Sequence, residues 1–227
     1  MEVFVGTSGW AYPWNKGGLD WYIRESGFNA VELNMSFYRL PFENMIRSWS
    51  VKGGKLRWII KVNRMITHVY KFGGDSLEFW QRFTEIFKPL DSLIDFYLFQ
   101  LPPSITPASL NLVEEFFKNT GLTTRIALEA RNVEWFSDEY LDWAERLGVV
   151  FVSVDSPKLP LNVYKVNDIV YVRMHGRSAW YKHYYSEDEL REVASKIMDL
   201  NPRRVYVFFN NDQGMLENGR RMMQLLK

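Results

Sequence analysis

The sequence has no cysteine among its 227 residues. This absence excludes a thiolate nucleophile, a disulfide-stapled scaffold, an iron–sulfur site and a cysteine-ligated zinc site, and it agrees with a reducing compartment. No run approaches the eighteen apolar residues of a membrane span, and the N-terminal residues lack both regions of a signal peptide. We therefore expect a cytoplasmic protein with no membrane association.

The sequence also has almost no net charge, because 28 Lys and Arg face 27 Asp and Glu, which gives +1. No global field would hold such a chain on nucleic acid, so a polyanion would need a local patch of cations. Neither G-x-G-x-x-G nor a P-loop motif occurs, which disfavours dinucleotide-binding and P-loop proteins. Aromatic residues make up 16% of the chain, and we expect some of them to line a site.

Short apolar runs rich in β-branched and aromatic residues predict eight strands. They lie at 2–6, 29–33, 57–62, 96–101, 125–130, 149–154, 169–174 and 205–210. Most are continuous apolar runs, which is typical of strands buried on both faces of a parallel sheet.

Helical periodicity and capping residues fill most of the intervals between these strands. Helices are predicted at about 75–87, 106–119, 137–147 and 186–197, and with weaker patterns at 16–26, 43–52 and 214–226. The segment 155–168 has turn residues and no helical pattern. Strands and helices that alternate in this way predict a (β/α)8 TIM barrel over a single domain, 1–227, without the helix between strands six and seven. A doubly wound open sheet is the alternative.

In a TIM barrel the chemistry lies where strands end at their carboxyl ends. The residues at these ends are unusually polar and aromatic. They include Trp10, Tyr12, Asn34, Tyr38, Lys61, Arg64, Glu129, Arg131, Asp155, Arg173, His175, Arg177, Tyr181, Asn210 and Asp212.

The same segments carry a family resemblance. They read GTSGW at 6–10, ELN at 32–34, SFYR at 36–39, QLPP at 100–103, EAR at 129–131, RMHGR at 173–177 and FNND at 209–212. In this order they resemble the YecE-like family, long catalogued as a domain of unknown function. The resemblance covers nearly the whole chain and implies a TIM barrel, but it implies no activity.

The cations at the strand ends suggest an anion site, since the planar fork of arginine matches phosphate or carboxylate oxygens. We expect Arg64, Arg131, Arg173 and Arg177 to clamp a phosphate, with Lys61 adding a point charge. The alternative is that each arginine pairs with a neighbouring carboxylate such as Glu129 or Asp155.

The aromatic residues at the same ends suggest a flat ligand, because bases and sugars both stack on Trp and Tyr. We expect Trp10, Tyr12, Tyr38 and Tyr181 to contact such a ring, with Asn34, Asn210 and Asp212 as polar contacts. Simple loop packing over the strand ends is the alternative.

Proton transfer is assigned to His175, with Glu129, Asp155 or Lys61 as partners. A divalent metal could assist, although no short metal-binding motif is present.

These patterns predict a hydrolase of a phosphate-containing substrate, preferentially a nucleotide or single-stranded nucleic acid. Two other readings stay open: a carbohydrate or small-acid enzyme of the glycosidase or isomerase kind, and a binding or scaffold protein without turnover. The sequence leaves the number of subunits open.

Overall fold

The computed structural model describes residues 1–227, with the side chain of Gln213 excepted. The strands are β1 Glu2–Thr7, β2 Ala30–Leu33, β3 Arg57–Lys61, β4 Ile94–Gln100, β5 Ile126–Glu129, β6 Val149–Phe151, β7 Ser153–Asp155, β8 Lys165–Val166, β9 Ile169–Met174 and β10 Arg204–Phe209. The α-helices are α1 Gly18–Glu25, α2 Glu43–Lys52, α3 Ser76–Phe87, α4 Leu110–Asn119, α5 Asp138–Arg146, α6 Glu187–Asp199 and α7 Met215–Leu225.

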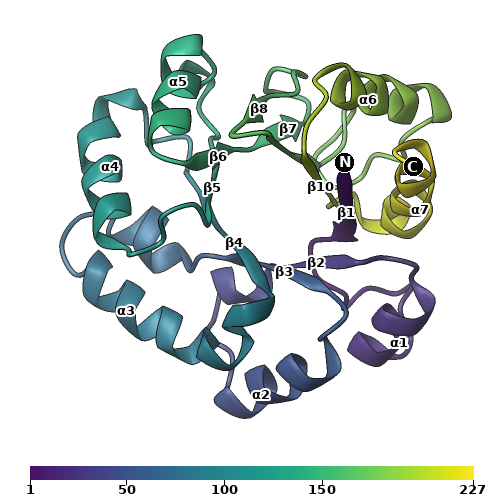
Figure 1. Cartoon of the computed structure of the whole chain (residues 1–227), viewed down its shortest axis with the longest axis horizontal. Coiled ribbons are helices and arrows are strands. Elements are labelled where there is room, and N and C mark those ends of the chain that lie inside the picture. The colour runs from purple at the N-terminus through teal and green to yellow at the C-terminus, as the bar shows by residue number, and fades with distance from the viewer.

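The strands form two sheets with parallel neighbours, in the orders β1-β10-β9-β7 and β2-β3-β4-β5-β6. An isolated parallel bridge between Ser8 and Glu32 lies where β1 meets β2. On the other side, Val152 alone separates β6 from β7. Figure 1 shows the strands around the centre of the view and the helices outside them.

One expected strand differs from the prediction. The run 149–154 divides into β6, which pairs with β5, and β7, which pairs with β9. The sequence shows only a continuous apolar run, because the change of partner depends on strands that are distant in the chain. The other seven expected strands lie within two residues of the observed bounds.

The helices lie within four residues of their predicted bounds, but the predicted N-cap residues Asp75 and Ser137 make no side-chain cap hydrogen bond. Ser186 and Glu189 form a capping box at the start of α6, in which each side chain accepts from the other residue's backbone N–H. The segment between β7 and β9 has no helix among its described residues, as expected, but it contains the short strand β8, which pairs antiparallel with β9. Figure 1 shows β8 at the periphery between α5 and α6.

The apolar residues form two layers because successive strand side chains point to opposite faces. A larger cluster lies between the strands and the helices, and a smaller one includes Ala30, Ile59, Ala127 and Tyr171. The smaller cluster fills the inner face of the strands. On each of these four strands, the residue two positions further toward the carboxyl end is charged.

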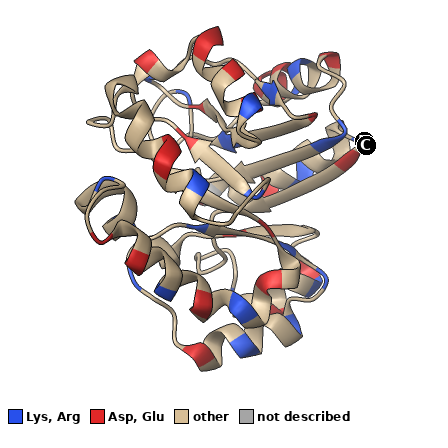
Figure 2. Cartoon of the chain, turned by 60° about the vertical axis from the view of Figure 1, so that its left-hand side comes forward, with Lys and Arg blue, Asp and Glu red and all other residues tan. Residues whose placement is uncertain are grey.

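The outer surface carries charges of both signs, spread over the helices in Figure 2. None of the described helices has the length and apolar character that crossing a membrane would require.

Gly6 allows β1 and β2 to approach each other. A Cβ added at Gly6 would lie 2.1 Å from the carbonyl oxygen of Ala30. We therefore predict that Gly6→Ala lowers the free energy of unfolding by about 2–4 kcal/mol. Gly54→Ala is the matched control, because the nearest atoms to its added Cβ lie 3.9 Å away, and its effect should stay within about 0.5 kcal/mol. Urea denaturation of both variants measures this, and equal effects would contradict the packing argument.

Candidate functional site

Four charged side chains meet at the carboxyl ends of the inner faces of four strands. Glu32 comes from β2, Lys61 from β3, Glu129 from β5 and Arg173 from β9, and all four residues are buried. Because each lies two residues beyond an inner apolar residue, the two-residue period of a strand points it toward the same interior. The charged layer therefore lies directly above the inner apolar cluster.

Arg173 is the centre of this layer, and its side chain is fully buried. Its Nε donates to Glu32 at 2.9 Å, and its two terminal nitrogens donate to Glu32 and Glu129. Burial alone would lower the pKa of Arg173, but the carboxylates of Glu129 and Glu32 raise it. Arg173 is thus a permanently charged group whose hydrogen bonds are taken by two glutamates.

Two hydroxyl groups complete the shell of Glu32. Ser8 Oγ donates to Oε1 at 2.6 Å and Tyr171 donates to Oε2 at 2.8 Å. Both oxygens of this carboxylate therefore have two donors each, so the buried charge is well satisfied.

Glu129 links Arg173 to Arg131 and to His175. Arg131 Nε donates to Glu129, and Arg131 Nη2 lies 3.1 Å from His175 Nε2. Burial would raise the pKa of Glu129, but Arg131 and Arg173 lower it well below its usual range. Glu129 is therefore ionised.

Both ring nitrogens of His175 face donor groups. Arg131 Nη2, which can only donate, lies 3.1 Å from Nε2, and the amide nitrogen Nδ2 of Asn210 lies 3.3 Å from Nδ1. A neutral imidazole accepts at one nitrogen only, so it accepts from one of these two groups. Burial, Arg173 and Arg131 lower the pKa of His175 to about 3. His175 is a neutral member of the network, and its predicted role in proton transfer stays a prediction.

Lys61 lies beside this network without a counter-ion. Lys61 is 5% exposed and forms no ion pair within the described part of the chain. Its Nζ lies 4.1 Å from the centre of the Phe37 ring. Burial and the charge of Arg173 lower the pKa of Lys61 to about 7. This amine exchanges its proton near neutral pH.

A second ion-pair group lies nearby and holds two further residues of the predicted site. Arg177 donates to Asp155 at 3.0 Å and to Glu192 at 2.6 Å, while Tyr185 donates to Asp155 at 2.9 Å. Burial raises the pKa of Asp155, although Arg177 opposes it. Arg177 is therefore engaged by carboxylates, as the paired alternative predicts.

The predicted aromatic contacts divide between two cavities. Trp10, Tyr12, Asn34 and Tyr38 line a cavity of about 420 Å³ next to the ends of β1 and β2. Tyr181 lines another, of about 570 Å³, together with Arg131 and Trp180. Arg131 lies over the Trp180 ring, 4.4 Å from its centre.

Two predicted residues lie apart from the buried network. Arg64 is exposed at the edge of the strand ends. Asp212 is also exposed and lines a separate cavity of about 440 Å³ with Lys182, His183 and Tyr184.

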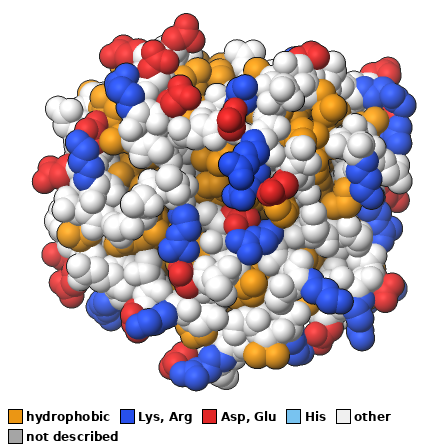
Figure 3. Space-filling view, viewed as in Figure 1, with side chains coloured by type: hydrophobic (Ala, Val, Ile, Leu, Met, Phe, Trp, Pro, Cys, Tyr) orange, Lys and Arg blue, Asp and Glu red, His pale blue; other side chains and the backbone are white. Residues whose placement is uncertain are grey.

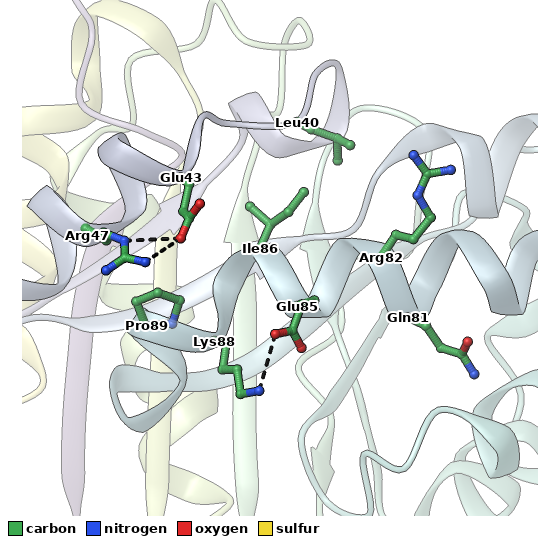
Figure 4. Close-up of a pocket in the computed structure, with 9 residues that line it drawn as sticks. All are labelled: Leu40, Glu43, Arg47, Gln81, Arg82, Glu85, Ile86, Lys88 and Pro89. Atoms are coloured by element: carbon green, nitrogen blue, oxygen red, sulfur yellow. Dashed lines mark hydrogen bonds and ion pairs between the residues drawn. The ribbon is translucent and has the colours of Figure 1, made fainter.

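A cavity of about 970 Å³ lies on the outside between α2 and α3 (Figure 4). Two local ion pairs line it, Arg47 with Glu43 and Lys88 with Glu85. It has no buried charge of the kind found at the strand ends.

Sequence reasoning missed Ser8 and Tyr171 as partners of the charged layer. Tyr171 looks like an ordinary strand residue, and only the two-residue spacing to Arg173 could have placed it on the inner face. Among the described residues, no group of three or more His, Asp or Glu is placed to hold a metal ion. The acidic oxygens of Glu32 and Glu129 are instead directed at Arg173.

A family model described as "Protein of unknown function DUF72" matches residues 4–227. The chain belongs to the DUF72 family. This confirms the YecE-like resemblance and leaves the activity open. No curated protein matches the chain.

Solved structures of DUF72 proteins are similar over the whole chain. One from Thermotoga maritima has 27% sequence identity and a TM-score of 0.87, covering 100% of this chain and 99% of that chain. One from Enterococcus faecalis has 20% identity and a TM-score of 0.82, covering 99% and 97%. D-psicose 3-epimerase from Clostridium cellulolyticum has 11% identity and a TM-score of 0.58, covering 100% and 97%, and shows the fold alone.

Removing the central cation should be costly. We predict that Arg173→Met lowers the free energy of unfolding by about 3–5 kcal/mol, because it leaves two buried carboxylates without their cation. Arg204→Met is the control, since Arg204 pairs with Glu2 at the surface and its loss should cost less than about 1 kcal/mol. Chemical denaturation at pH 7 compares the two. A similar cost for both would mean that Arg173 does not organise the site.

Proposed function

We propose that this DUF72 protein is an isomerase-like enzyme that transfers protons on a small anionic substrate, with Lys61 as the base. The observation that carries the proposal is a buried amine without a counter-ion and with a pKa of about 7. Such an amine has a free lone pair at neutral pH, when an ordinary lysine is protonated. A base is most effective when its pKa lies near the working pH.

The charges around Lys61 support a small anionic substrate. Glu32 and Glu129 balance Arg131 and Arg173, so this network adds no net charge. The remaining positive charge comes from the exposed Arg64 and from the protonated fraction of Lys61. Burial lowers the pKa of His68 to about 4, and the charges of Lys61, Arg64 and Arg131 contribute to this shift. We propose that Arg64 and the solvent-facing side of the Arg131 guanidinium bind the anionic group of the substrate.

The four-arginine phosphate clamp has less support. Arg173 is paired with two glutamates, and Arg177 donates from Nε to Asp155 and from Nη1 to Glu192, while its Nη2 is buried without a partner among the described residues. Figure 3 shows the opposite side of the molecule, the face at the amino ends of the strands; there Lys and Arg lie among Asp and Glu without the continuous basic stripe that a nucleic-acid backbone would need.

Hydrolysis of a small phosphate ester is the second candidate, because the cations around His68 would suit a phosphate as well as a carboxylate. The two candidates differ in their products. Release of inorganic phosphate without proton exchange on carbon would favour hydrolysis.

We also propose that the two sheets close into one TIM barrel. The support is the Ser8 and Glu32 bridge on one side and the nearly continuous passage from β6 to β7 on the other. A closed barrel would hold the four strands of the charged layer around one interior.

Proton transfer on carbon can be detected without a known product. The protein is incubated in D2O with a panel of small hydroxy acids, keto acids and sugar phosphates, and each compound is examined by mass spectrometry. We predict that at least one compound gains deuterium and that Lys61→Met lowers the rate by about a hundredfold or more. Lys16→Met, at an exposed lysine, is the control and should retain the rate. Incorporation that survives Lys61→Met would contradict the role of Lys61.

Lys61 should also reduce stability in a pH-dependent manner. Its pKa is lowered from 10.5 to about 7, so the unfolded chain binds more protons between these values and stability rises with pH across this window. Below pH 7 the folded protein must hold a buried ammonium. We predict that below pH 7 Lys61→Met raises the free energy of unfolding by on the order of 3 kcal/mol. The difference in unfolding free energy between variant and wild type should narrow toward pH 10. Denaturation curves at pH 6 and 9 measure this, and a destabilised variant at pH 6 would overturn it.

A further inference from the structure

The loop between β9 and α6 brings a serine, a histidine and a glutamate into one hydrogen-bonded chain. Ser178 Oγ lies 2.8 Å from His183 Nδ1, and His183 Nε2 lies 3.0 and 3.1 Å from the two oxygens of Glu189. None of the three belongs to the charged layer around Arg173. Their order is that of a nucleophile, a base and a group that orients the base.

The protonation states of Glu189 and His183 suit an activated serine. Burial would raise the pKa of Glu189, but hydrogen bonds from Ser186 N–H and from His183 lower it, so the carboxylate is ionised. An ionised carboxylate only accepts, which places the imidazole proton on Nε2 and leaves the lone pair of Nδ1 to accept from Ser178, whose hydroxyl lies at 2.8 Å and whose backbone N–H donates at 3.4 Å. Nδ1 is therefore positioned to take the proton of Ser178.

Secondary structure fixes the base and its orienting group. Glu189 lies in the first turn of α6, where the same carboxylate accepts from Ser186 N–H at 2.8 Å. The His183 ring packs edge-on against Tyr185, with ring centres 4.7 Å apart. The His183 side chain is only 13% exposed, whereas Ser178 is exposed. The arrangement presents the hydroxyl to solvent and shields the base.

The backbone around Ser178 supports the same role. Gly176 has a φ of +108°, and a Cβ there would lie 2.6 Å from His183 Cβ and from the Ala179 carbonyl oxygen. Only glycine permits this close turn after a strand. The N–H of Ala179 makes no hydrogen bond to another residue within the described chain. A free N–H directly after the nucleophile is where serine hydrolases stabilise an oxyanion.

We propose that Ser178, His183 and Glu189 form a second catalytic site that cleaves small carboxylic esters. Ser178 Oγ bonds to the ester carbonyl carbon while its proton moves to His183 Nδ1. The bond from that carbon to the alkoxy oxygen then breaks, and the same proton passes to the departing alcohol. Water then bonds to the acyl carbon while it gives a proton to His183 Nδ1. The bond from that carbon to Ser178 Oγ breaks, the proton on Nδ1 returns to Oγ, and the acid leaves. His183, but not Ser178, also lines the cavity of about 440 Å³.

The test uses the full-length protein and a fluorophosphonate, which phosphonylates an activated serine with loss of fluoride. We expect about one adduct per chain on the peptide that contains Ser178, and no adduct in Ser178→Ala. Glu189→Gln keeps the shape of the carboxylate but removes its charge, and it should slow labelling by about a hundredfold.

Ser186→Ala is the matched control, because it removes the side-chain half of the capping box and leaves Glu189 on His183. Its labelling rate should stay within about twofold of the wild type, although its melting temperature falls. Thr67 is an internal control, since it contacts His68 Nδ1 at 2.8 Å and should not react. Three results would overturn the proposal: no labelling of the folded wild type, labelling at another residue, or an equal loss of labelling rate in Ser186→Ala and Glu189→Gln. The hydrogen bonds among Ser178, His183 and Glu189 would then serve only the structure of the loop. The outcome does not depend on the role of Lys61.

Discussion

The buried guanidinium of Arg173 is the interaction on which the carboxyl ends of the strands depend. A cation without solvent must be paired, and here carboxylates from β2 and β5 supply the pairing from two sides. This requirement draws strands from both sheets toward one point. Glu129 then holds Arg131, and Arg131 lies against His175 Nε2. The chemistry of the site follows from the pairing of one residue.

The same pairing explains why Lys61 differs from its neighbours. Glu32 and Glu129 direct their oxygens at arginines, so no carboxylate is left to hold a lysine ammonium. Arg173 also lies close enough to lower the pKa of Lys61 by repulsion. A network that satisfies its own charges thus leaves one amine that can release a proton near neutral pH. This connects the stability of the site to its proposed chemistry.

The sequence predicted the order of strands and helices well, because apolar runs and caps are local signals. The position of the site also followed from the residues that end each strand. The pairing did not, because whether Arg173 meets a substrate or Glu32 depends on distances between strands far apart in the chain. Likewise, 149–154 changes partner at Val152 without any local break in its apolar pattern. The contacts among Ser178, His183 and Glu189 were missed because Ser178 and His183 lie in a loop without a motif, while Glu189 shows only the capping-box pattern of α6.

The most direct test of the account is the pKa of Lys61 itself. Lysine side chains labelled with ¹³C can be followed by NMR from pH 5 to 11, and Lys61→Met identifies the signal. The account predicts that the signal lost in Lys61→Met titrates near pH 7. A Lys61 signal that titrates at the value of a lysine in a model peptide, about 10.4, would mean that the amine is charged at neutral pH, and the proposed base would be lost.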